Sequence, residues 1–113
     1  MDKFYIKQNS NWPSLTATLK QADGNPIPLV NAQEVKFFMS RKNGNPKIDG
    51  GACAILEEDG ENEGRIRYEW QNGDTDTRGE YWAEFEIIFA DGKRQKVPSK
   101  DYNEIVIGQK LGQ

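Results

Sequence analysis

The sequence predicts an all-β domain, a sandwich of seven to eight short antiparallel strands. Apolar residues recur with a period of two rather than 3.6, and they do so in short runs separated by Gly, Asn, Asp and Pro. No segment has the pattern of a helix longer than one turn. With 113 residues, 35% hydrophobic and 29% charged, the chain is expected to form a single domain over residues 1–113 around one core.

The expected strands follow one another at short intervals along the chain. They cover residues 3–8, 14–21, 34–41, 52–57, 65–70, 79–89, 94–97 and 102–107. Clusters of turn-forming residues separate them, and the clearest is Asp91-Gly92, because Asp-Gly readily forms the tight turn between two antiparallel strands. Short strands that alternate with such turns favour two packed layers over one open sheet.

Alternation within the strands predicts which side chains fill the core. The segment 79–89 is the clearest case, with Tyr81, Ala83, Phe85, Ile87 and Phe89 on one face and Glu80, Trp82, Glu84, Glu86 and Ile88 on the other. The first face is expected to be buried and the acidic one solvated. We expect Tyr81, Phe85, Phe37 and Trp70 to meet between the layers and anchor the core.

Composition argues against several classes of function. Fifteen basic and 18 acidic residues are mixed along the chain and give a net charge of -3, so nucleic acid is not an expected partner. The chain has no histidine, which removes histidine-based triads, and no catalytic or cofactor-binding residues are predicted. Its one cysteine, Cys53, allows no internal disulfide and is expected to be a small core residue. No signal peptide or membrane-spanning segment is found, so the protein is expected to fold in the cytoplasm without contacting a membrane.

Two acidic clusters are candidate metal sites. Acidic residues alternate before a glycine over residues 59–64, as in a calcium-binding loop, but the twelfth position, which should supply a carboxylate, is Trp70. Asp74 and Asp76 could gather around a cation, although tight turns commonly use Asp in this way. A solvated hairpin tip and an ordinary turn are therefore expected, and no metal is predicted.

One local pattern resembles immunoglobulin-type domains. In Gly79-x-Tyr81-x-Ala83, the tyrosine near the start of a strand matches the tyrosine whose hydroxyl bonds to upstream backbone in those domains. The position where antibody domains have a cysteine is Ala83 here. The resemblance implies an immunoglobulin-like β-sandwich that is held together by packing, without a disulfide.

A second resemblance covers nearly the whole chain. The segments FYIKQ, WPSLTATLKQADGNPIPL, VKFFM and GRIRYEWQNGDTDTRGEYWAEFEIIFADGK are similar to short immunoglobulin-like proteins of bacteriophages and prophages, in particular the N-terminal domain of phage baseplate upper proteins. The shared positions are core and turn residues. The resemblance implies a non-catalytic structural or assembly protein of a tail, baseplate or head. Its partners would be other virion proteins or a second copy, in the virion or in the host cytoplasm during assembly.

Four apolar residues interrupt otherwise polar surroundings and are candidate protein contacts. Trp82 and Ile88 share the acidic face of segment 79–89, Phe38 lies on the polar side of its strand, and Trp12 precedes Pro13 in a predicted loop. The alternative, which the sequence leaves equally open, is that these residues cover a loop or pack under the N-terminal strand. Because the chain contains three tryptophans, a carbohydrate-binding module that stacks sugars on exposed rings is the second functional candidate.

Overall fold

The computed structural model describes residues 3–42, 44–58, 61–98 and 102–112, and these residues form eight strands. The strands are β1 (Lys3–Lys7), β2 (Leu15–Thr18), β3 (Ala32–Arg41), β4 (Pro46–Ile55), β5 (Arg65–Tyr68), β6 (Gly79–Phe89), β7 (Arg94–Val97) and β8 (Asn103–Gly108). Every strand expected from the alternation is present, and no helix in these ranges is long and apolar enough to cross a membrane.

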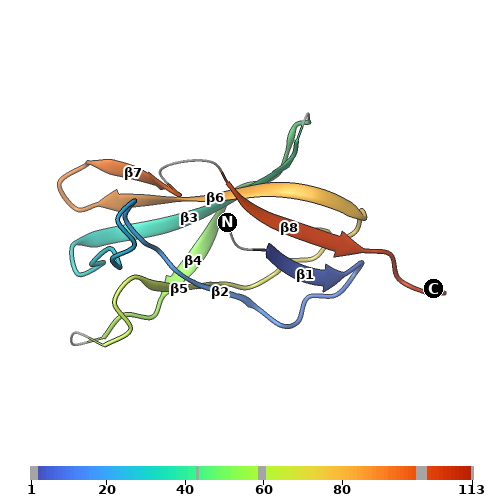
Figure 1. Ribbon diagram of the computed structural model, residues 1–113, viewed down its shortest axis with the longest axis horizontal. Helices are drawn as coiled ribbons and strands as arrows, with labels where there is room; N and C mark the ends of the chain where they lie inside the picture. Colours follow the sequence, from blue (N-terminus) through green and yellow to red (C-terminus); the bar gives the residue numbers. More distant parts are fainter. Residues whose placement is uncertain (1–2, 43, 59–60, 99–101, 113) are drawn as a thin grey trace.

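The strands form two layers that share one strand. The larger layer has the order β1-β8-β6-β3-β4, and β7 pairs with β6 as well. The smaller layer contains β5 and β2 and is joined through the last residues of β4, where Ala54 and Ile55 pair with β5. β4 therefore passes from the layer of β3 to the layer of β5 and β2 (Figure 1). The result is an immunoglobulin-like β-sandwich without a disulfide.

The strands are antiparallel except for β1, which runs parallel to β8 over five residue pairs. Parallel neighbours cannot be joined by a tight turn, and here almost the whole chain connects them. β8 shares one edge of β6 with β7: Val97 of β7 lies opposite Phe85, and Asn103 of β8 lies opposite Ala83.

The core lies between the layers and has an aromatic centre. Phe37 is 0% exposed, and its ring centroid lies 4.8 Å from that of Tyr68, 5.1 Å from Phe85 and 6.0 Å from Trp70. Tyr81 is buried as well, so all four expected anchors are inside. Rings that meet in tilted and edge-on arrangements stabilise the core beyond the apolar area that they bury.

Tyr81 also forms the corner contact expected from the immunoglobulin resemblance. Its hydroxyl donates a hydrogen bond to the backbone oxygen of Thr77, at 2.7 Å. This contact satisfies the one polar atom of a side chain that is otherwise surrounded by the core. The prediction of a tyrosine corner is therefore confirmed.

β4 begins earlier than the sequence predicts, at Pro46 rather than Ala52. The glycines Gly50 and Gly51 in this stretch suggest a loop, but they fit the strand for specific reasons. Gly50 has a φ of 88°, which favours glycine, next to a shift in the β3–β4 register. Gly51 lies directly under the ring of Tyr68 and leaves space for it.

Candidate functional site

The register of β3 and β6 places two of the predicted contact residues on the outer face of the larger layer. Trp82 on β6 lies opposite Ser40 on β3, and Phe38 on β3 lies opposite Glu84 on β6. Their neighbours along each strand are core residues, so these side chains point away from the core. The two rings are therefore diagonal neighbours on adjacent strands, close enough to border one surface feature.

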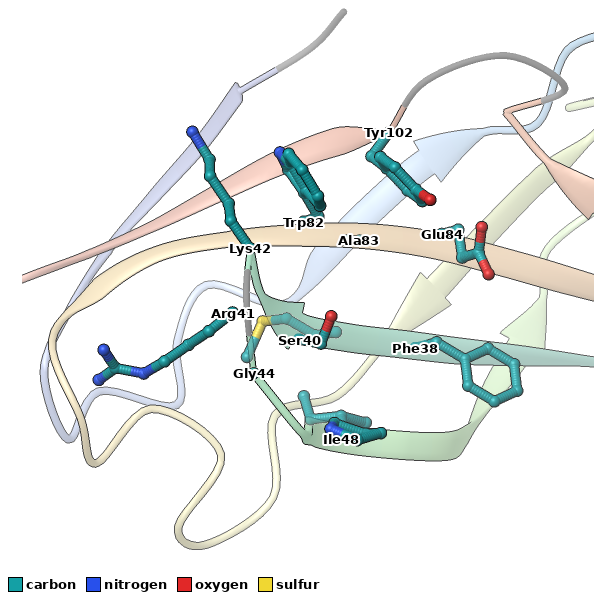
Figure 2. A pocket seen from close by; sticks show the side chains of 12 residues that line it. Phe38, Ser40, Arg41, Lys42, Gly44, Ile48, Trp82, Ala83, Glu84 and Tyr102 are labelled. Carbon is teal, nitrogen blue, oxygen red and sulfur yellow. The ribbon is translucent and has the colours of Figure 1, made fainter.

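Trp82 is held between two other side chains. Its ring stacks on Tyr102, which precedes β8, with centroids 4.9 Å apart and planes inclined by 11°. The ammonium group of Lys42, just after β3, lies 5.8 Å from the centre of the indole ring. Figure 2 shows Lys42 and Tyr102 on opposite sides of Trp82, so both faces of the indole are covered. Tyr102 remains 39% exposed.

A hollow of about 380 Å³ lies beside this ring pair on the outer face. Trp82 and Tyr102 border it on one side and Phe38 on the other, with Ser40 and Glu84 among its polar lining (Figure 2). Its volume falls within the roughly 300–1,000 Å³ of typical binding clefts.

Charged groups surround the rings of this hollow. The ammonium of Lys96 on β7 lies 5.0 Å from the centre of the Phe38 ring and 3.3 Å from a carboxylate oxygen of Glu84. Lys42 lies 3.6 Å from a carboxylate oxygen of Glu80. The site thus combines aromatic surface with fixed charges of both signs.

The other two predicted contact residues lie elsewhere. Ile88 is only 7% exposed, so the prediction that it is an exposed contact is wrong. It sits on β6 between Glu34 of β3 and Arg94 of β7, whose long side chains rise from the same face and cover it. Trp12 is 76% exposed, but it lies in the loop between β1 and β2 and does not line the hollow.

The expected acidic face is only partly solvated. Glu80 is exposed, but Glu86 is 9% exposed and lies between Lys36 and Lys96 on the neighbouring strands. Its carboxylate lies 3.4 Å from a guanidinium nitrogen of Arg94. The prediction of a wholly solvated face is wrong because neighbouring basic side chains, which pair with the carboxylates, cover its centre.

The acidic pair Asp74 and Asp76, a candidate cation site, makes internal contacts. Asp74 accepts hydrogen bonds from the Tyr68 hydroxyl at 2.6 Å and from the Gln71 backbone N–H at 2.8 Å. Asp76 accepts one from Lys47 at 2.5 Å, and this contact lowers the pKa of its carboxyl group. Among the residues that the structure describes, no group of three or more His, Cys, Asp or Glu is placed to hold a metal ion. The calcium-loop pattern lies partly outside these residues, because 59 and 60 are not described.

Cys53 on β4 is half-buried and packs against the core. Burial raises the pKa of its thiol to about 12, so the thiol stays protonated at neutral pH. A protonated thiol is a poor nucleophile, and this environment suits a structural side chain.

Comparisons with known proteins bear on the fold. No protein-family model and no curated protein matches the chain. Among solved structures it is similar to the crystal structure of CopC from Methylosinus trichosporium OB3b, with a TM-score of 0.51, 8% identity, and coverage of 100% of this chain and 90% of that one. The likeness is one of fold. At this level of identity it carries no information about ligands or partners.

The sequence predicted two aromatic residues of the site, Trp82 and Phe38. It did not predict Tyr102 and Lys42, which lie on either side of Trp82. The contact between Tyr102 and Trp82 could not be predicted. It depends on β8 pairing with the part of β6 next to the part that pairs with β7. Lys42 follows β3 and stands beside Trp82 only once the β3–β6 register is known. Alternation along one strand contains no information about this pairing.

Proposed function

We propose that this protein is a non-catalytic structural or assembly module of a bacteriophage or prophage particle, acting in the virion or in the host cytoplasm during assembly. It would bind another particle protein, or a second copy of itself, through the outer face of the β1-β8-β6-β3-β4 layer. The observation that carries the proposal is the Trp82–Tyr102 ring pair beside the hollow of about 380 Å³. The particle context comes from the sequence resemblance.

The chemistry of the hollow supports a protein partner. Large aromatic side chains that are partly exposed and already fixed by packing lose little conformational freedom on binding, and interfaces are enriched in them. Trp82 is fixed between Tyr102 and Lys42, and Lys96 lies over Phe38. A partner side chain could enter between the rings and meet Ser40 at their base.

A carbohydrate ligand is the second candidate, because rings and polar groups border the same hollow. Sugars stack on the open face of an aromatic ring. Within the hollow, Trp82 has a side chain on each face and Phe38 has Lys96 over its ring, which leaves the outer side of Tyr102 for stacking. A protein contact therefore fits the geometry better.

The proposal is tested by co-expressing the protein with the products of genes that flank its own and measuring complex formation by size-exclusion chromatography with light scattering. For a complex that forms, Trp82→Ala is expected to raise the dissociation constant about 30-fold, as removal of a central interface aromatic does. Trp12→Ala is the matched control, since Trp12 is exposed and lies outside the hollow, and it should change the constant less than about twofold.

A third variant separates binding from folding. Ser40→Arg adds a bulky side chain on the outer face opposite Trp82, fills the hollow and removes no ring. It should block the complex while the thermal midpoint stays near that of the unchanged protein. A protein that remains a monomer with every flanking product, or a complex that Trp82→Ala and Ser40→Arg leave intact, would overturn the proposal.

A glycan array decides the second candidate. Binding to a defined saccharide that Tyr102→Ala abolishes and Trp12→Ala retains would favour the carbohydrate-binding module over the protein contact.

A further inference from the structure

A second groove lies between the two layers, at the side where β2 faces β1 and β8. It has a volume of about 320 Å³. Its walls come from β2 on one side and from the starts of β1 and β8 on the other, with Leu15, Ala17, Phe4 and Ile105 among the apolar lining. The core rings of Phe37 and Phe85 also line it, so the groove reaches the interior of the sandwich.

The β2 side of this groove is an open strand edge. β2 pairs with β5 alone among the described strands, and the backbone N–H of Leu19 bonds to the Gly64 oxygen at 2.8 Å in the same register. Backbone N–H and C=O groups alternate in direction along a strand. Those of Leu15 and Ala17 therefore point toward β5, and those of Thr16 and Thr18 point away from it. The latter two residues can therefore accept an additional strand.

Positive charge lies along the same edge. Arg65 of β5 lies opposite Thr18, donates a hydrogen bond to its hydroxyl at 3.4 Å, and lines the groove. Lys20 follows β2 and is exposed. Within the described part of the chain, neither cation has a carboxylate within 4.0 Å, whereas Lys3 on the opposite wall lies 3.7 Å from a carboxylate oxygen of Glu104. The β2 side is therefore complementary to an acidic partner.

A second copy of the chain does not match this charge. The edge strand β1 carries Lys3 and Lys7, and the edge strand β7 carries Arg94 and Lys96. Pairing either edge with β2 would bring like charges together, which is a common means of preventing edge-to-edge association. We therefore expect the occupant to come from a different protein.

We propose that the groove binds an extended segment of another protein in which apolar and acidic residues alternate, and that this segment adds to β2 as a further strand. Its backbone bonds to the outward groups of Thr16 and Thr18. Side chains on its inner face enter the groove toward Phe4 and Ile105, and those on its outer face meet Arg65 and Lys20. This surface is separate from the Trp82 hollow, so the inference goes beyond the proposed function and does not depend on it.

The test uses the full chain and a fluorescein-labelled peptide, Ser-Val-Glu-Val-Glu-Val-Ser, whose binding is followed by fluorescence anisotropy at low salt. The matched peptide, Ser-Val-Lys-Val-Lys-Val-Ser, has the same apolar residues and the opposite charge. The acidic peptide is expected to bind at least about tenfold more tightly than the basic one, and raising the salt concentration should reduce this difference.

Amide hydrogen exchange measured by NMR locates the bound strand. The N–H groups of Thr16 and Thr18 should gain protection when the acidic peptide is added. Those of Leu15 and Ala17, which already face β5, serve as internal controls and should change little.

Two variants complete the test. Thr16→Pro removes an N–H that takes no part in pairing with β5, so β2 should stay folded while peptide affinity falls about tenfold. Arg65→Glu should lower the affinity for the acidic peptide about fivefold. Lys7→Glu, an equal charge change on β1, should leave this affinity unchanged. Equal binding of both peptides, unchanged exchange at Thr16 and Thr18, or a concentration-dependent dimer that Thr16→Pro disrupts would overturn the proposal.

Discussion

At Gly51 a single added methyl group should collide with a side chain of the core. A Cβ atom there would lie 2.6 Å from Cε1 of Tyr68 and 3.1 Å from both Cζ and the hydroxyl oxygen. The ring cannot move aside easily. It is 3% exposed, packs against Phe37 and Trp70, and is tied to Asp74 by a hydrogen bond of 2.6 Å.

Two opposing effects set the size of the change in Gly51→Ala. Because Gly51 has no positive φ, the substitution restricts the unfolded chain and should stabilise by about 0.4–1 kcal/mol. Overpacking against a fixed ring costs roughly 1–3 kcal/mol. The clash is the larger effect, so the free energy of unfolding should fall by about 1–2 kcal/mol.

Urea denaturation followed by tryptophan fluorescence measures this change. Gly108→Ala is the matched control, because a Cβ there meets nothing closer than 3.7 Å and the variant should be neutral or slightly more stable. Leucine at position 68 has no atom where Cε1 lies, so the cost of Gly51→Ala should largely disappear in the Tyr68→Leu background, a coupling of about 1–2 kcal/mol. A cost that is the same in both backgrounds would refute the reasoning.

Three further outcomes are expected. Tyr81→Phe, which loses the bond to the Thr77 oxygen, should lower the free energy of unfolding by about 1 kcal/mol in the same urea assay. Glu57→Ala, which leaves two backbone N–H groups without their shared carboxylate acceptor at 2.9 Å, should cost about 2 kcal/mol, and Glu57→Gln about half of that. Since the pKa of Cys53 is raised from 9.0 to about 12, the unfolded thiol loses its proton first, and stability should fall as pH rises across that interval. Cys53→Ala should make this alkaline decline, measured by thermal melts, less steep; an equal slope would contradict the assignment.

The sequence predicted the strands because alternation depends on local residue types. The bounds of β6 and β7 match the predicted 79–89 and 94–97, and the four predicted aromatic anchors are buried. The first half of β4 was missed. Its proline and glycines are residue types typical of a loop. They form a strand because this segment pairs with β3, and Gly51 leaves room for the ring of Tyr68.

The surface was harder to predict than the core. Whether an outward side chain is exposed depends on its neighbours across the sheet, and those follow from register. Glu86 is buried between Lys36 and Lys96 for this reason, and Ile88 is buried between Glu34 and Arg94. The parallel pairing of β1 with β8 joins residues about a hundred positions apart, and no local pattern indicates it.

That parallel pairing has a mechanical consequence. β1 begins beside the start of β8, so a pull that separates the first residue of β1 from the last residue of β8 acts along both strands in opposite directions (Figure 1). The hydrogen bonds between them lie across the direction of force and must break together, whereas a hairpin pulled open at its end loses them one by one. The two strands therefore act as a shear clamp that resists extension of the chain.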